Sequence, residues 1–319
     1  MEIFHHDLNI NFLGARKVSV TISVILMLVS IWAITVKGLN YGLDFTGGIL
    51  IDVAYERPVD VGDVRDALSR AGFDHAVVQS VGGTRQISIR LQPPKSAGGK
   101  SPDEVADQVS KEVLTALAAR HAGVKLAHPP DFVGPEVGQE LKISGIYAAI
   151  VVIIGIAIYL GMRFEKRFAF AALVSEVHDT IITVGIIALV QREFDMTVLA
   201  SILAVVGYSI NDKVVVFDRV RELFRLTRKA ETPQILNRAI NNTLSRTIIT
   251  SLFTAITMAC LYLFGGDAVH GFAITMLIGI LVGTLSSIFF ASPILLWLGV
   301  SKKDLMPVTK DNPELARRP

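Results

Sequence analysis

The chain is poor in cysteine and carries little net charge. Its 319 residues include one cysteine, Cys260, which lies inside an apolar run, so the polar segment 37–140 cannot form a disulfide bond. We expect Cys260 to be a packing residue rather than a reactive thiol. The formal net charge is only +2, from 31 Lys and Arg against 29 Asp and Glu, and nothing else in the sequence indicates a nucleic-acid partner.

Nucleotide-binding motifs are missing as well. The stretch GGKS at 98–101 resembles the end of a phosphate-binding loop, but the glycine that should open such a loop falls at Pro94. We interpret this stretch as a linker followed by a helix cap. The sequence therefore predicts that the chain is not an enzyme, hydrolyses no ATP, and needs no cofactor and no metal.

Long apolar runs dominate what is present. Hydrophobic residues make up 51% of the chain and the mean hydropathy is +0.50, above the usual range of a soluble domain. About 20 apolar residues cross a hydrocarbon core of ~30 Å. The first run is too long for a cleavable signal and has no small-residue cleavage motif after it. The pattern predicts a polytopic membrane protein with six spans, at 18–36, 141–162, 168–190, 196–217, 246–264 and 271–298.

Basic residues gather at one end of these runs. They precede the first run, join the second to the third, crowd a basic loop at about 218–245, and follow the sixth run. The loops at the opposite end, 191–195 and 265–270, contain one Arg between them. Because short cytoplasmic loops are rich in Lys and Arg, we expect both termini, 1–17 and 299–319, in the cytoplasm of a bacterial inner membrane. Residues 37–140 are then exported to the periplasm.

The exported segment alternates between strand-like and helix-like patterns. Asp60 and Ser101 are placed to cap two helices, the second as a capping box with Glu104, and Gly82-Gly83 is expected to form a turn. Strands are predicted at 49–55, 75–81, 85–91 and near 125–133, and helices at 61–72 and 101–121. This β-α-β-β-α-β order predicts a small ferredoxin-like α+β domain between the first and second spans.

Few ionisable residues lie inside the apolar runs. His178 and Asp179 are about 15 Å into the third run at 1.5 Å per residue, near the middle of the membrane. Asp212 falls in the cytoplasmic third of the fourth run, and Arg246 opens the fifth run from the same side, at a similar depth. A charge inside a span costs roughly 2.5–3.5 kcal/mol on insertion scales, so such groups usually pair or line a polar path.

Asp212 has two interpretations on these grounds. In the first it forms a structural ion pair with Arg246 or Lys213; in the second it is a proton or cation site whose affinity changes when Arg246 moves. Lys213 is the weaker partner, because adjacent helical residues point about 100° apart and its long stem can reach the interface. Arg246 can reach the interface in the same way. His178 and Asp179 are compatible with a polar contact between helices or with a proton relay.

Glycines within the spans favour close approach of helices. Gly279 and Gly283 form a small-x-x-x-small face on the sixth span. The other glycines of this kind are Gly145, Gly155, Gly185 and Gly207.

Five motifs occur in an order that is typical of one family. They are GLNYGLDFTGG (38–48), FVGPEVG (132–138), HD (178–179), GYSINDKVVVFDRVRE (207–222) and TLSRTIITS (243–251). With six spans and one exported domain, the chain resembles the SecF family, the smaller subunits of bacterial SecD–SecF protein-export complexes in the resistance-nodulation-division superfamily. The resemblance covers essentially the whole chain. For LDFTGG we favour a glycine turn into the first exported strand over a hinge or interface role.

The resemblance implies a translocase subunit that uses the proton-motive force to assist export through SecYEG after the ATP-driven step of SecA. It assigns proton coupling to Asp212 and Arg246, with Asn211, His178 and Asp179 in support, and protons as the coupling ion. Many relatives carry a small hydroxyl residue in place of Lys213, which bears on the charge of Asp212 at rest.

The implied partners begin with SecD, which supplies the other half of a two-repeat transporter. SecYEG, the translocating preprotein and membrane lipids are also implied, with YajC and YidC as further candidates. Two other functions stay open. One is a structural subunit that stabilises the translocon without conducting protons. The other is a proton-coupled small-solute exporter of the same superfamily, although about one hundred exported residues are few for a substrate pocket.

Overall fold

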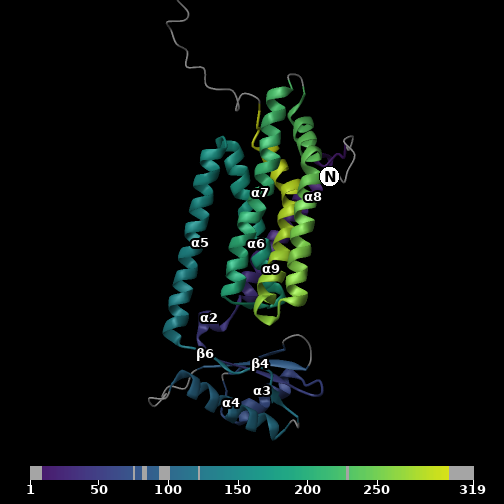
Figure 1. Cartoon of the computed structure of the whole chain (residues 1–319). Helices are drawn as coiled ribbons and strands as arrows, with labels where there is room; N and C mark the ends of the chain where they lie inside the picture. The colour runs from purple at the N-terminus through teal and green to yellow at the C-terminus, as the bar shows by residue number, and fades with distance from the viewer. Residues whose placement is uncertain are drawn as a thin grey trace, which may run out of the picture. The chain divides into compact units, whose positions relative to one another are not determined.

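The computed structural model describes residues 9–74, 76–80, 85–92, 101–120, 123–227 and 230–301 (Figure 1). The chain divides into two compact units, one comprising Tyr41–Ala148 and the other the residues up to Asn40 and from Ala149 onwards. We call the first the α+β unit and the second the membrane unit.

Among the described residues, six helical spans are long and apolar enough to cross a membrane, which agrees with the predicted number. The first is α1 (Arg16–Trp32), preceded by a 3-10 turn, η1 (Leu13–Ala15), and continued by a π-helical turn, η2 (Ala33–Lys37). Then come α5 (Pro135–Arg163), α6 (Lys166–Val190), α7 (Met196–Leu226) and α8 (Thr232–Phe264). The sixth span combines α9 (Asp267–Ser286), a π-helical turn η3 (Ser287–Ala291) and α10 (Ser292–Trp297).

The link between the fourth and fifth spans differs from the expected basic loop at about 218–245. Helix α7 continues to Leu226, and α8 begins at Thr232, with a proline in its first turn where the missing N–H costs nothing. Helices of 31 and 33 residues are about 46 and 50 Å long, well beyond a hydrocarbon core of ~30 Å. The basic segment is therefore almost entirely helical.

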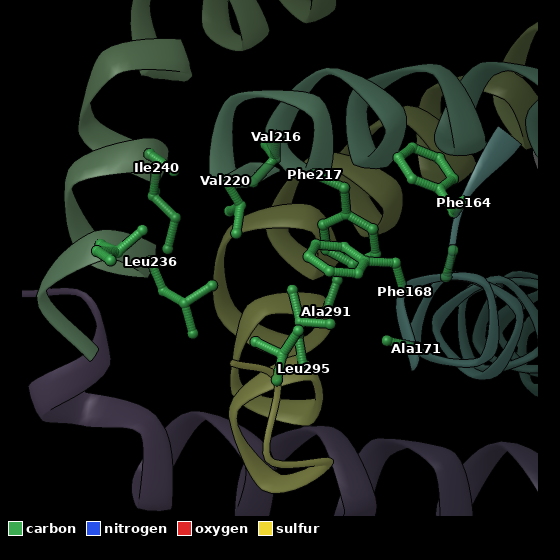
Figure 2. Packing of buried hydrophobic residues seen from close by; sticks show 14 of the residues in the cluster. Phe164, Phe168, Ala171, Val216, Phe217, Val220, Leu236, Ile240, Ala291 and Leu295 are labelled. Carbon is green, nitrogen blue, oxygen red and sulfur yellow. The ribbon is translucent and has the colours of Figure 1, made fainter. Parts of the chain in front are cut away.

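Helices α7 and α8 extend past the predicted spans because, in each, apolar residues at helical spacing form a buried face there. Aromatic rings form its centre: Phe168 lies 5.7 Å from Phe217 between ring centroids, and Phe164 lies 6.1 Å from Phe217 (Figure 2). Around the rings pack residues of α6, α7, α8, η3 and α10: Ala171, Val216, Val220, Leu236, Ile240, Ala291 and Leu295. This core holds the ends of α7 and α8 against the turn between α5 and α6.

Three glycines let helices approach as the sequence predicted. A Cβ on Gly185 of α6 would lie 2.2 Å from Ser30 Cβ of α1, and one on Gly279 of α9 would lie 2.2 Å from Val205 Cγ2 of α7. At Gly283 the nearest atom would be Ser209 Oγ, at 2.7 Å. The same prediction is wrong for Gly155 and Gly207 within the described residues, because a Cβ at either position would meet open space.

Cys260 is exposed on α8, so the expectation that it packs inside this chain is wrong. Lipid and protein interiors are similarly apolar, so hydropathy alone does not show which side of a membrane helix faces its neighbours.

The α+β unit contains an antiparallel sheet in the order β3-β4-β2-β5, with β6 also paired to β2. Its elements are β2 (Gly48–Ala54), α3 (Val61–Arg70), β3 (Val77–Ser80), β4 (Gln86–Leu91), α4 (Pro102–Ala118), β5 (Lys125–Leu126) and β6 (Asp131–Val133). Both helices lie on one face of the sheet (Figure 1). This is the predicted ferredoxin-like order, with the last strand split in two. Two further strands of two residues each are β1 (Asn40–Tyr41) and β7 (Glu193–Phe194).

Local signals in this unit act as the sequence predicted. Asp60 accepts a hydrogen bond from the Gly62 N–H at 2.6 Å, and Ser101 forms a capping box with Glu104. Ile51 of β2 lies opposite Ile89 of β4, and both are fully buried. The predicted turn at Gly82-Gly83 and residues 98–100 of GGKS lie outside the described residues.

The LDFTGG segment turns the chain into β2. Leu43–Thr46 form a one-turn helix, α2, that the sequence did not reveal. Gly47 closes it with φ +63° and donates its N–H to Leu43 O at 2.8 Å. Gly48 follows with φ +129°, and a Cβ there would lie 2.5 Å from Leu91 O. Both positions therefore require glycine.

Gly185→Ala is expected to destabilise the chain by about 1–3 kcal/mol, because the added methyl group overlaps the backbone of α1 at Ser30. Gly155→Ala is the matched control: it adds the same methyl group to a helix but meets open space, so it should be neutral or slightly stabilising. Reversible unfolding of the purified chain in bicelles measures both. Equal unfolding free energies for the two variants would contradict the close contact between α1 and α6.

Candidate functional site

A cluster of ionisable side chains joins α6 to α7 inside the membrane unit. Lys213 Nζ lies 2.6 Å from Glu176 Oε2 and 2.8 Å from Asp179 Oδ2, and it donates a hydrogen bond to Ser209 Oγ at 2.9 Å. Glu176 and Asp179 are three residues apart, as are neighbours on one face of a helix, and Ser209 and Lys213 are four apart. With His178, these residues form what we call the polar cluster.

His178 and Ser209 complete the hydrogen bonding of Asp179. His178 Nδ1 lies 2.8 Å from Asp179 Oδ1, while Ser209 Oγ donates to Asp179 Oδ2 at 2.7 Å. The imidazole also stacks on the ring of Phe290, with centroids 3.8 Å apart. Asp179 and Lys213 are both 0% exposed, so this ion pair is entirely removed from solvent.

The expectation that the Lys213 side chain reaches the interface is wrong, whereas Lys213 forms no ion pair with Asp212 within the described residues, as expected of its weaker partner. Its side chain does not reach toward the interface; it points from α7 into α6 and is buried between the carboxyl groups of Glu176 and Asp179. These two groups and Ser209 replace the hydrogen bonds that the ammonium group would make with water. Glu176 was not predicted from the sequence, although its spacing from Asp179 places both on one helix face. Of the two interpretations for His178 and Asp179, the structure contains the polar contact between helices.

Asp212 lies apart from the polar cluster. It is only 4% exposed, and its Oδ2 has no hydrogen-bond partner among the described residues. Arg246 of α8 is near enough for its charge to act on Asp212, yet no ion pair within 4 Å joins them in the described part of the chain. The structural ion pair of Asp212 with Arg246 or Lys213 is therefore not formed. Arg246 and Asn211 are both exposed.

Further polar contacts link α7, α8 and α9. Tyr208 of α7 donates to Ser251 of α8 at 3.2 Å, and Ser251 bonds Thr284 of α9 at 2.7 Å. At the basic ends of the helices, Arg163 pairs with Asp218, and Arg221 pairs with Glu165 at 3.0 Å. Among the described residues, Asp212 thus differs from the neighbouring carboxyl groups in having no hydrogen-bond or ion-pair partner.

Two models of known protein families match this chain. Residues 112–301 match the family described as protein export membrane protein SecD/SecF, C-terminal, and residues 32–59 match the SecD/SecF GG motif. The chain belongs to the SecD/SecF family. The LDFTGG turn at 43–48 lies inside the second match, and Asp179, Asp212, Lys213 and Arg246 lie inside the first.

Curated SecF proteins match over nearly their whole length. The protein translocase subunit SecF of Pseudomonas aeruginosa is 44% identical over 93% of this chain and 94% of its own length. That of Escherichia coli O157:H7 is 40% identical over 89% of this chain and 86% of its own length. The chain is therefore similar to SecF over all six spans.

Solved structures of SecDF share the fold. The crystal structure of SecDF from Thermus thermophilus, described as a translocon-associated membrane protein, is 32% identical with a TM-score of 0.80. A SecDF structure in a super-membrane-facing form is 31% identical with a TM-score of 0.65. These matches cover 93% and 92% of this chain but 40% and 39% of the SecDF chains. The chain thus spans about two fifths of SecDF, and the six-helix unit with its small α+β domain is confirmed.

Lys213→Met is expected to lower the unfolding free energy by about 3–5 kcal/mol, because it leaves Glu176 and Asp179 buried without their cation. Arg219→Met is the matched control, since Arg219 pairs with the half-exposed Glu222 and such a surface pair contributes at most about 1 kcal/mol. Unfolding in bicelles at neutral pH measures both. A Lys213→Met variant as stable as Arg219→Met would show that the buried contacts are not formed.

Proposed function

We propose that the chain is a protein translocase subunit that couples proton movement across the bacterial inner membrane to protein export, in a complex with SecD. The observation that carries the proposal is Asp212: its carboxyl group is buried in a membrane span, has no contact partner within the described residues, and lies within electrostatic range of the exposed Arg246 on the next helix. Membership of the SecD/SecF family supports the translocation role.

Proton uptake by Asp212 removes a negative charge that attracts Arg246. Arg246 is exposed on α8 and bound by no ion pair within the described residues, so its long side chain can change position when that charge disappears. The change alters the packing of α7 against α8. One charge that crosses 100 mV contributes about 2.3 kcal/mol, which is enough to bias a two-state element by roughly fifty-fold.

A second six-helix half, supplied by SecD, fits the burial of the spans. In α6, α7 and the sixth span, 50% of the apolar window is buried, against 6% in α8 and 11% in α5. Paired repeats are common in transporters, with the coupling site at their interface. The exposed Asn211 and Arg246 would then lie near that interface.

The charge pattern and the family support an orientation in the membrane and a set of partners. Both termini face the cytoplasm, and the α+β unit is exported, where it contacts the emerging preprotein. The complex acts with SecYEG after the ATP-driven step of SecA, and YajC and YidC are further candidate partners. Protons are the coupling ion, and the chain itself carries out no enzymatic reaction and holds no cofactor.

Asp212→Asn is expected to abolish the stimulation of export by a proton gradient, because the amide has no titratable proton. The measurement is preprotein export in inverted membrane vesicles that contain the chain with its SecD partner, with and without the gradient. ATP-driven export without the gradient is the internal control and should be unchanged. Normal gradient dependence in this variant would leave a structural subunit as the better description.

Arg246→Lys is expected to keep part of the gradient-stimulated export, whereas Arg246→Leu should lose it, because only the first retains a cation near Asp212. Lysine and leucine have similar volumes but only lysine is charged, so a difference in export between the two variants reports on the charge at position 246. The same vesicle assay compares them. If both export equally well, the charge of Arg246 has no role in coupling.

A further inference from the structure

The polar cluster contains two acidic groups but only one basic group that is always charged. Glu176 and Asp179 are carboxyl groups, Lys213 is a single ammonium group, and all three are at most 6% exposed. With a neutral His178 and both carboxyl groups ionised, the cluster would carry a net charge of −1 inside a membrane span. A buried net charge is costly, and a group in this position usually binds or releases a proton instead.

Within the described residues, the helices that pack against the cluster offer no charge to balance it. The parts of α1, α9, η3 and α10 that contact α6 and α7, at 18–32, 271–286 and 287–297, contain no Asp, Glu, Lys, Arg or His. Their polar contribution is a hydroxyl group, Ser286 Oγ, which lies 2.9 Å from Ser175 Oγ. Lys37 of η2, which also packs on α6, donates to Leu189 O at the other end of that helix. On α8 the basic group of the span is Arg246, whose charge acts on Asp212 instead. The cluster therefore has to reach neutrality by itself.

The hydrogen bonds favour one of the two carboxyl groups as the ionised one. Both oxygens of Asp179 are engaged: Oδ1 by His178 Nδ1, and Oδ2 by Ser209 Oγ and Lys213 Nζ. Glu176 is engaged only through Oε2, which meets Lys213, and its Oε1 is buried without a partner among the described residues. An ionised carboxylate needs donors on both oxygens far more than a neutral carboxyl group does. Asp179 is suited to the charge, and Glu176 to the proton.

We propose that the polar cluster is a second proton-binding site of this chain, in which Glu176 holds the proton at rest and Asp179 and Lys213 form the permanent ion pair. The neutral state then contains one ammonium, one carboxylate and one carboxylic acid. Release of the proton leaves a net charge of −1. His178 is in direct contact with Asp179, the carboxylate that keeps its charge in both states.

His178 also places one side of the cluster against a pocket of about 320 Å³ bounded by α1, α6, α9 and η3. The lining of this pocket is mostly apolar, with Ser19, Ser23 and Ser286 as its other polar side chains. The Nε2 atom of His178 is buried and has no hydrogen-bond partner in the described part of the chain. The pocket therefore supplies no charge that could balance the cluster.

Infrared spectroscopy with isotope labelling tests the proposal on the full chain. The chain is purified into lipid nanodiscs at neutral pH, once unlabelled and once with ¹³C in the side-chain carboxyl group of every glutamate. A buried protonated glutamate gives a carboxylic-acid C=O band that moves on glutamate labelling. Exposed glutamates are ionised at this pH and give no such band. Because the label marks Glu and not Asp, protonation of Asp212 does not interfere, and the outcome is independent of the proposed coupling role of Asp212.

The expected result is one label-sensitive carboxylic-acid band that is lost in Glu176→Gln and retained in Glu222→Gln, a matched change at a half-exposed glutamate. Glu176→Gln should unfold at the same midpoint as the original chain, because glutamine resembles the neutral acid, whereas Asp179→Asn should unfold at a clearly lower midpoint. A chain with no label-sensitive band overturns the proposal, even if Glu176→Gln fails to fold. A band that survives in a folded Glu176→Gln variant also overturns it.

Discussion

The contact of Lys213 with Glu176 and Asp179 is the constraint on which the membrane unit depends. Inside a bilayer no hydrophobic force favours one helix pairing over contact with lipid, so interhelical polar contacts and small residues decide the packing. Ser209 belongs to the cluster and also lies where Gly283 of α9 makes its close approach. One group of side chains thereby fixes the register of α6, α7 and α9, and separating these helices would expose an unpaired charge.

The same contact explains why Asp212 forms no ion pair with the adjacent Lys213. Neighbouring residues on a helix point about 100° apart, so when Lys213 is held against α6, Asp212 is directed away from the cluster. The ammonium group that could have neutralised Asp212 is already shared between two other carboxyl groups. The charges of both Lys213 and Arg246 act on Asp212. Lys213 is held in the polar cluster, so in the proposed mechanism Arg246 is the cation that can move when Asp212 takes up a proton.

Sequence patterns predicted the features that depend on composition along one element. Length and hydropathy gave the six spans, strand alternation gave the ferredoxin-like order, and Asp60 and Ser101 capped their helices as expected. Features that depend on the direction of a side chain in three dimensions were missed. Cys260 is exposed, and Lys213 is buried, because an apolar helix carries no sign of which side meets its neighbours. Glu176 was overlooked since its importance comes from a residue 37 positions away.

The exposed polar groups near Asp212 favour contact with a second protein chain at this position. Asn211 and Arg246 are exposed on α7 and α8, in spans whose other exposed residues are mostly apolar and suited to lipid. An amide or a guanidinium group that faces hydrocarbon loses its hydrogen bonds with water and gains none. Such groups are stable where a second protein surface or a water-filled path meets them. The placement of these two residues beside a buried carboxyl therefore supports a coupling site shared with a second helical half, which is what the proposed complex with SecD would supply.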